Sequence, residues 1–199
     1  MEEVARRVFR AYNYREIRTP IFEETALFAR GVGEETDIVS KEMYTWDDHG
    51  TSLTLRPENT ASVIRSYIEH RMDQLPGLVK LYYIGPMFRR ERPQKGRYRQ
   101  FFQIGAEAIG GDSPAVDAEV IEMVSEILTG AGLEGFKLLI NSVGDANCRP
   151  IFVAALKEKL QDVKHTMCAD CQRRADTNPL RVLDCKVPED QPIIETLPS

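Results

Sequence analysis

Residues 81–110 read LYYIGPMFRRERPQKGRYRQFFQIGAEAIG, in which a basic segment separates two stretches that are mostly apolar. The apolar run Leu78–Ile84 predicts a buried strand, which Gly85-Pro86 should break before extension resumes over Phe88–Arg92. A Pro-Gln-Lys-Gly quartet then predicts a turn, and residues 98–109 should run back as a second strand. The sequence therefore predicts two antiparallel strands joined by a basic turn.

The returning strand separates its side chains into two sets, because alternate residues of a strand face opposite sides. One set suits a core and consists of Phe102, Ile104, Ala106 and Ala108. The other set is mostly polar and consists of Phe101, Gln103, Gly105 and Glu107. If the two strands pair, Arg89 and Glu91 of the outgoing strand join the polar set. We therefore expect one polar platform whose reverse side packs on the core.

Positive charge is concentrated in the turn. Residues 89–99 hold six Lys or Arg and one acid, Glu91, which gives +5. The whole chain has 26 basic and 31 acidic residues, a net charge of 26 − 31 = −5, so the remainder carries −10. Such a cluster predicts an anionic ligand, with a solvated charged loop as the alternative.

The platform has the dimensions and side chains for a nucleotide joined to an amino acid. From Phe101 to Glu107 there are six steps of about 3.3 Å, which is roughly 20 Å. Phe101 can stack on a base, Glu91 can accept a hydrogen bond from an exocyclic amine, and Arg89 can hold a phosphate. Glu107 can pair with an ammonium group. The alternative is a half-buried sheet whose exposed face is merely polar.

Composition restricts the class of protein. With 199 residues, 42% hydrophobic and 29% charged, the chain is expected to form a globular core. No apolar run approaches the roughly 18 residues of a membrane span. The start of the chain is acidic and has no apolar signal core, and the four cysteines form no dense framework, so we expect a cytoplasmic protein.

Hairpins and helices alternate irregularly along the chain, which favours an α+β fold with an antiparallel sheet. Val116, Val120, Met123, Val124 and Ile127 form the expected inner face of one helix, which starts at Ser113-Pro114 and ends near Gly130. The other expected elements are a helix over 2–12, a hairpin of Met43–Trp46 with Ser52–Leu55, a helix over 60–70, a strand over Phe136–Ile140, a helix over Cys148–Leu160 and an irregular tail from Pro188.

Several stretches of the sequence resemble those of a known family. The run from Phe88 to Gln103 resembles motif 2 of the class II aminoacyl-tRNA synthetases, in the form typical of the histidyl-tRNA synthetases. Residues 16–23, with Pro20, resemble motif 1, and residues 54–60 and 178–184 resemble further stretches of that family. The resemblance implies a class II synthetase-like antiparallel sheet flanked by helices, incomplete in this chain.

The resemblance also implies roles for individual residues. Arg89 would hold the α-phosphate of ATP, Arg97 would reach the γ-phosphate, and Glu91 and Phe101 would hold adenine. The positions implied for histidine binding are Glu58, Asn59, Thr60, Arg89, Gln103 and Glu107, where Asn59 replaces a glycine often found in the family. The implied reaction is activation of L-histidine by ATP with Mg²⁺, followed by transfer to tRNA(His), with Arg89 as the catalytic residue.

Several parts of the family pattern are missing between residues 1 and 199. We find no Arg-Gly-Leu-Asp-Tyr-Tyr stretch, no motif 3 arginine and no anticodon-binding domain. We therefore expect a partial class II catalytic domain that is inactive or nearly so by itself, from a parent protein that forms a homodimer. The alternative is a non-catalytic relative, such as a regulatory subunit of ATP phosphoribosyltransferase or a sensor domain.

A metal site receives weaker support. Cys168 and Cys171 have the spacing of a zinc-binding pair, and Cys185 and Cys148 are further candidates. The remaining spacings are loose and a second close pair is absent, so the sequence predicts ordinary thiols and no metal. The three histidines, His49, His70 and His165, are scattered and are expected to be solvated.

Overall fold

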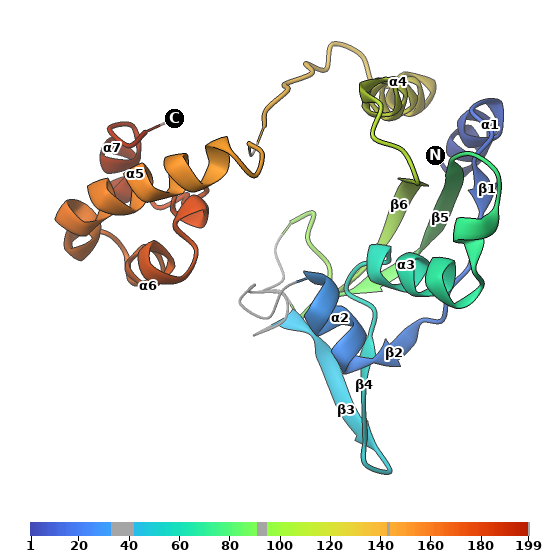
Figure 1. Cartoon of the computed structure of the whole chain (residues 1–199), viewed down its shortest axis with the longest axis horizontal. Helices are drawn as coiled ribbons and strands as arrows, with labels where there is room; N and C mark the ends of the chain where they lie inside the picture. Colours follow the sequence, from blue (N-terminus) through green and yellow to red (C-terminus); the bar gives the residue numbers. More distant parts are fainter. Residues whose placement is uncertain (33–41, 91–94, 143, 199) are drawn as a thin grey trace. The chain divides into compact units, whose positions relative to one another are not determined.

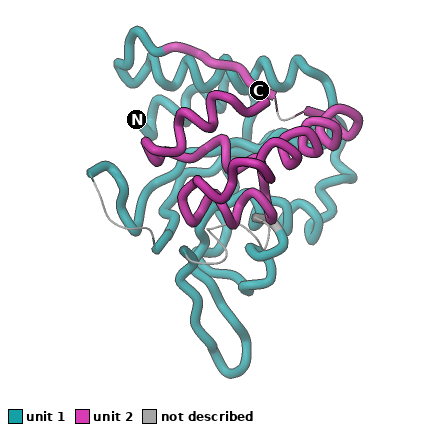
Figure 2. The backbone as a smooth tube through the Cα atoms, turned by 90° about the vertical axis from the view of Figure 1, so that its left-hand side faces the viewer, with its two compact units in different colours: residues 1–136 teal, residues 137–199 magenta. Residues whose placement is uncertain are grey.

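The computed structural model describes residues 1–32, 42–90, 95–142 and 144–198. They form two compact units, residues 1–136 and residues 137–199, which Figure 2 colours separately. Among the described residues, no helix combines the length and apolar composition that a bilayer crossing needs.

The first unit combines helices with two small sheets (Figure 1). Its elements are α1 (Glu2–Ala11), β1 (Arg15–Glu16), β2 (Phe22–Glu24), α2 (Thr25–Val32), β3 (Tyr44–Asp48), β4 (Thr51–Leu55), α3 (Thr60–Glu69), the 3-10 turn η2 (Met72–Gln74), β5 (Val79–Phe88), β6 (Gln100–Ile109) and α4 (Pro114–Gly130). The strand orders are β1-β5-β6 and β2-β4-β3. The α+β prediction is confirmed.

Strands β5 and β6 form the long antiparallel pair that the sequence predicted. Their register runs from Val79 opposite Ile109 to Phe88 opposite Gln100. The predicted break at Gly85-Pro86 is wrong, because β5 continues through both residues. The amide of Phe88, two residues after Pro86, points away from β6 and donates to the Arg56 carbonyl. Proline at position 86 therefore removes no hydrogen bond from the β5–β6 ladder.

The two faces of this sheet are packed differently. Tyr82 of β5 and the inward residues Ile104, Ala106 and Ala108 of β6 pack against α1 and α4, as predicted for the core side. On the other face, α3 contributes Val63 to a cluster with Val79, Leu81, Tyr83 and Met87, and Phe101 and Ile109 pack at its edge. Apolar residues that pack with α3 therefore run along this face from Val79 to Met87, and the polar side chains of β6 lie among them.

The second sheet contains the predicted hairpin. Strands β3 and β4 pair from Tyr44 opposite Leu55 to Asp48 opposite Thr51, and β2 pairs with the other edge of β4. His49 and Gly50 form the turn with φ values of 52° and 88°. Two successive positive φ values match the right-handed twist of a tight hairpin. This prediction is confirmed.

Helix predictions are confirmed with small corrections. α1, α3 and α4 lie where the apolar periodicity placed them, and the Ser113 hydroxyl accepts from the Ala115 amide at 3.3 Å to cap α4. Val124 is 50% exposed, because the buried stripe of α4 runs through Met123 and Ile127 instead. Phe102 is 64% exposed, because the packing of α1 and α4 on this face of β6 extends only to Ile104.

The second unit is helical. It contains α5 (Cys148–Val163), η3 (Lys164–Thr166), α6 (Ala169–Thr177), η4 (Pro179–Val182), η5 (Pro188–Asp190) and α7 (Gln191–Ile194). The predicted strand over Phe136–Ile140 is wrong: within the described residues this segment belongs to no helix or strand, and Leu139 and Ile140 are largely exposed. The predicted irregular tail is also wrong, since Pro188 and Pro192 occupy the first turns of short helices, where proline is tolerated.

Candidate functional site

The candidate site lies on the β5–β6 sheet, where its polar side meets the start of α3. Glu58 caps this helix: its carboxylate accepts from the Thr60 amide at 2.5 Å and from the Ala61 amide at 3.1 Å. The Thr60 hydroxyl in turn donates to Glu107 of β6 at 2.7 Å. The structure thus brings together three residues that the sequence assigned to histidine binding, although 47 positions separate Thr60 from Glu107.

Arg89 and Phe101 meet at the other end of the site. The guanidinium carbon of Arg89 lies 5.1 Å from the centre of the Phe101 ring, and its Nε donates to the Pro57 carbonyl at 2.9 Å. The neighbouring Arg90 is exposed and lies over the Tyr44 ring instead, 5.0 Å from its centre. Two adjacent arginines are therefore directed to different surroundings, and Arg89 is the one that faces the platform.

Gln103 lies between these two ends. It pairs with Gly85 in the ladder and faces the same side as Phe101 and Glu107. Its side-chain oxygen is buried and accepts no hydrogen bond within the described residues. A buried acceptor without a donor costs free energy, so this oxygen is suited to a donor from a ligand.

Burial and neighbouring charge raise the pKa values of two side chains in this site, Glu107 and Tyr83. Burial raises the pKa of Glu107, the charge of Glu58 raises it further, and the hydrogen bond from Thr60 partly opposes both effects. Burial also raises the pKa of Tyr83 to about 12, and the nearby Thr60 hydroxyl partly opposes this rise. A carboxylate held in such surroundings gains from a cationic partner such as an ammonium group.

A buried arginine fixes the segment that leads into α3. Arg56 is 6% exposed and donates from Nε to the Pro86 carbonyl at 2.9 Å and from Nη1 to the Thr19 carbonyl at 3.1 Å. The Asn59 side chain, 1% exposed, accepts from the Thr19 hydroxyl at 2.6 Å. The Asn59 side chain therefore belongs to this support, and its carbonyl accepts from the Val63 amide at 3.0 Å.

Arg97 and Glu91 are the remaining residues that the sequence assigned to the site. Arg97 is described and exposed, and Glu91 lies outside the described residues. Arg56 and Tyr83 also belong to the site, and neither was predicted as a site residue from the sequence. Neither position had a local signal: the strand before Arg56 reads Thr-Ser-Leu-Thr-Leu, and the position of Tyr83 became informative only with the ladder register.

Tyr83 and Gly105 lie opposite each other in the ladder, and the ring covers the glycine. A Cβ atom at position 105 would overlap the Tyr83 ring. We expect Gly105→Ala to lower the free energy of unfolding by about 1–3 kcal/mol, because the ring must move within a packed cluster. Urea unfolding of the 199-residue chain measures this. In a Tyr83→Ala background the same change should cost much less, and equal costs in both backgrounds would contradict the contact.

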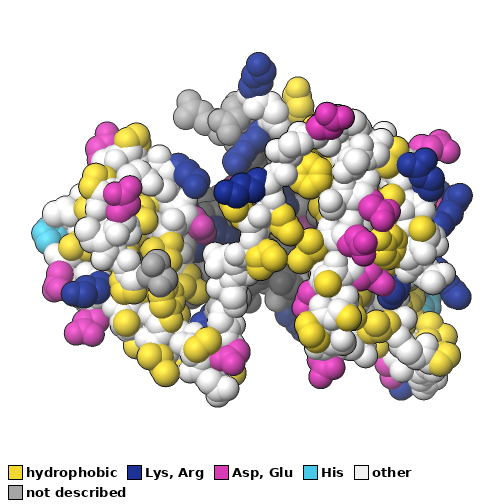
Figure 3. All heavy atoms as spheres, turned by 90° about the horizontal axis from the view of Figure 1, so that it is seen from above, with side chains coloured by type: hydrophobic (Ala, Val, Ile, Leu, Met, Phe, Trp, Pro, Cys, Tyr) yellow, Lys and Arg dark blue, Asp and Glu magenta, His cyan; other side chains and the backbone are white. Residues whose placement is uncertain are grey.

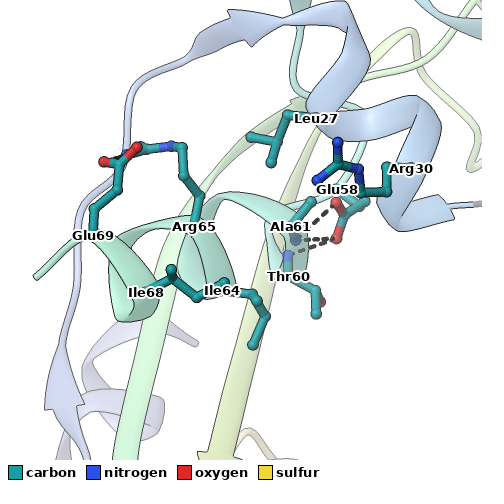
Figure 4. Close-up of a pocket in the computed structure, with 9 residues that line it drawn as sticks. All are labelled: Leu27, Arg30, Glu58, Thr60, Ala61, Ile64, Arg65, Ile68 and Glu69. Atoms are coloured by element: carbon teal, nitrogen blue, oxygen red, sulfur yellow. Dashed lines mark hydrogen bonds and ion pairs between the residues drawn. The ribbon is translucent and has the colours of Figure 1, made fainter. Parts of the chain in front are cut away.

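A pocket of about 610 Å³ opens beside the site, between α2 and α3 (Figure 4). Glu58 and Thr60 line one end of it, and Leu27, Ile64 and Ile68 provide apolar walls. At the far end Arg65 pairs with Glu69 at 2.6 Å and with Glu23 at 2.6 Å. The pocket therefore joins the helix cap to an apolar groove.

A family model described as Histidyl-tRNA synthetase matches residues 1–175 of this sequence. The chain belongs to the histidyl-tRNA synthetase family. The histidine–tRNA ligase of Solibacter usitatus (strain Ellin6076) is 78% identical over 200 residues, which cover the whole chain and 48% of that protein. That of Koribacter versatilis (strain Ellin345) is 68% identical over 211 residues, with the same coverage. The chain spans about half the length of these curated relatives.

Solved structures support the same family and fold. The apo histidyl-tRNA synthetase of S. aureus superposes with a TM-score of 0.71 at 49% identity, covering 90% of this chain and 42% of that one. Pyrrolysyl-tRNA synthetase from Desulfitobacterium hafniense superposes with a TM-score of 0.60 at 18% identity, covering 71% of this chain and 49% of that one. This second likeness concerns the fold alone. The predicted class II synthetase-like architecture is confirmed.

Proposed function

We propose that this chain is part of the catalytic domain of a histidine–tRNA ligase, which activates L-histidine with ATP and transfers it to tRNA(His). The observation that carries the proposal is the row of groups along one face of the sheet: Arg89 against Phe101, the unpartnered Gln103 oxygen, and Glu107 bonded to Thr60. Family membership and two curated ligases above 65% identity support the ligase over a non-catalytic relative.

The roles of the residues follow from the chemistry. Histidine carboxylate must attack the α-phosphate of ATP, so two anions must approach each other. Arg89, which already faces the platform, is proposed to hold the α-phosphate and stabilise the charge of the transition state. Phe101 would stack on adenine with Glu91 as its polar partner, and Arg97 would reach the γ-phosphate from the turn.

The amino-acid end is proposed to lie at the start of α3. Glu107 and Glu58 would face the ammonium group of histidine, with Thr60 and Gln103 as hydrogen-bonding groups and Asn59 contributing its backbone. Glu58 and Glu107 already accept hydrogen bonds at the start of α3, and both are assigned here to the ammonium group of histidine. ATP enters as its Mg²⁺ complex, and no residue of this chain is assigned to the ion.

Amino-acid-dependent exchange of pyrophosphate into ATP tests the proposal in the full-length protein. Histidine is expected to support exchange, and the other amino acids are expected to support little or none. Failure of histidine to support exchange, with ATP still bound, would favour the regulatory or sensor class. The reaction is proposed to occur in the cytoplasm.

We also propose that the full-length protein is a homodimer. Residues 16–23 resemble motif 1, and Ile21 and Phe22 in this stretch are 45% and 50% exposed. Phe22 contacts Trp46, itself 39% exposed, at a centroid distance of 5.8 Å. Exposed apolar groups of this kind suit a subunit contact. Sedimentation of the full-length protein at micromolar concentration tests this, and a monomer would contradict it.

A further inference from the structure

Three cysteines and one aspartate converge in the second unit. The ligand atoms of Cys168, Cys171, Cys185 and Asp190 all lie within 4.8 Å of one another. Cys171, Cys185 and Asp190 are buried, with exposed fractions of 0%, 6% and 1%. All four cysteines of the chain are free thiols. Three buried groups and the partly buried Cys168 thus place four soft or anionic ligand atoms at one point, which is unusual in a core, where polar groups need partners.

Three separate segments supply these groups. Cys168 is the N-cap residue of α6 and Cys171 lies in its first turn, so the two-residue spacing directs both thiols to one side. Cys185 follows η4, and Asp190 ends η5. Asp190 is held by the Cys168 amide, which donates to its carboxylate at 3.0 Å. The fold therefore supplies the fourth ligand that the cysteine spacing alone did not predict.

Two distances within the group are close to those between ligand atoms of a tetrahedral zinc site. The Sγ atoms of Cys168 and Cys185 are 3.9 Å apart, close to the ~3.8 Å that two Zn–S bonds of about 2.3 Å span at the tetrahedral angle. Cys185 Sγ lies 3.2 Å from Asp190 Oδ2. The amide of Val187 points at Cys185 Sγ from 3.4 Å, and such donors support ligands that carry negative charge.

The cysteine group is part of the core of the second unit. Among the described residues of 137–199, eight buried residues form this core, and Cys171 and Cys185 are two of them. A metal bound by these groups would cross-link segments of the unit, because metal binding is coupled to folding. The cysteine pair at the start of α6 and the Cys185–Asp190 segment are the parts that such a link would join.

We propose that Cys168, Cys171, Cys185 and Asp190 bind one structural Zn²⁺ ion. Three thiolates and one carboxylate fill the four positions, so the site is closed and has no place for a substrate. Cobalt serves as a spectroscopic probe, because tetrahedral thiolate coordination gives Co²⁺ intense visible and charge-transfer bands. This site is separate from the residues proposed for histidine activation, so it stands or falls independently of that function.

The test uses the 199-residue chain, purified under reducing conditions and dialysed against metal-free buffer. We expect one zinc per chain by elemental analysis. After a chelator has removed the zinc, we expect a tetrahedral Co²⁺ spectrum that added Zn²⁺ abolishes. Less than about 0.2 zinc per chain, together with no Co²⁺ spectrum, would overturn the proposal. This measurement needs no variant, so it remains decisive even if a substituted chain does not fold.

Variants locate the ion. Cys171→Ser is expected to weaken Zn²⁺ binding by at least about 100-fold, and Asp190→Asn by about 10- to 100-fold, measured by competition with a chromogenic chelator. Cys148→Ser is the matched control, because Cys148 is exposed and outside the group, and it should bind Zn²⁺ as the unchanged chain does. Equal loss in Cys148→Ser and Cys171→Ser, or unchanged binding in Cys171→Ser, would overturn the assignment.

Discussion

Replacing Arg89 with alanine in the full-length protein is expected to lower histidine-dependent ATP–pyrophosphate exchange by about 10²- to 10³-fold, the usual cost of removing one donor that stabilises a transition state. The Arg89 guanidinium lies against Phe101 and is oriented by the Pro57 carbonyl. It is therefore placed before substrate arrives. The fall should appear in kcat, because the charge that Arg89 offsets develops during the reaction.

Arg90→Ala is the control for this experiment. Arg90 is the next residue, carries the same charge and is exposed over Tyr44. Its loss changes the net charge as Arg89→Ala does, so a general effect of charge on ATP attraction would appear in both variants. We expect exchange within about threefold of the unchanged enzyme for Arg90→Ala. Similar losses in the two variants would show that position 89 has no special role.

A lysine at position 89 separates charge from geometry. It keeps the positive charge but loses the planar fork that donates to two oxygens at once. Arg89→Lys should therefore recover only a small part of the lost exchange rate. Full recovery would mean that a point charge is sufficient, and that the orientation by Pro57 contributes little.

The strand alternation could be predicted from the sequence because it depends only on local backbone geometry. Ile104 and Ala106 face the helices, and Gln103 and Glu107 face the other side, as the period of two requires. The break at Pro86 was predicted wrongly because proline interrupts only the edge that its missing amide would face. That edge is set by the register between β5 and β6, which no local pattern contains.

Contacts between distant segments were the part that the sequence did not reveal. The strand predicted over Phe136–Ile140 needed a neighbour, and apolar residues alone do not supply one. The support of α3 by Arg56 joins residues 37 positions apart, from Thr19 to Arg56. Asp190 lies near the cysteines only because η4 and η5 bring the chain back to α6. Each of these features depends on tertiary packing, which overrides local preference.

The exposed apolar residues have a related explanation. In Figure 3 hydrophobic side chains lie exposed among charged ones, and Ile21, Phe22, Leu139 and Ile140 are among the large apolar residues that are at least 45% exposed. The chain covers about half of its relatives. Surfaces that remain apolar in this half are suited to the further parts and the second subunit proposed above.

Replacing Glu107 with glutamine is expected to change stability and histidine affinity in opposite directions. The folded state raises the pKa of Glu107 above its ordinary value of 4.5, through burial and the charge of Glu58. Between that value and the raised one, the folded state binds more protons than the unfolded state, so stability falls as the pH rises through this range. A glutamine cannot ionise and keeps an acceptor for the Thr60 hydroxyl.

The 199-residue Glu107→Gln chain should therefore be more stable than the unchanged chain at pH 7, by a few tenths of a kcal/mol, because solvent screens a partly exposed group. The difference should vanish below the ordinary pKa of the carboxyl. Urea unfolding at several pH values measures it. A stability loss for Glu107→Gln at pH 7 would contradict the effect of burial on the pKa of Glu107.

In the full-length enzyme the same change removes the proposed partner of the histidine ammonium group. We expect the KM for histidine to rise by at least about 30-fold, which corresponds to about 2 kcal/mol for one member of a buried charge pair, while the KM for ATP changes little. An unchanged KM for histidine would contradict the role of Glu107, even if the stability result held. The charge of Glu107 costs stability in the empty protein and is needed when substrate binds. An uncharged glutamine would stabilise the fold more, so the carboxylate is explained by its ligand.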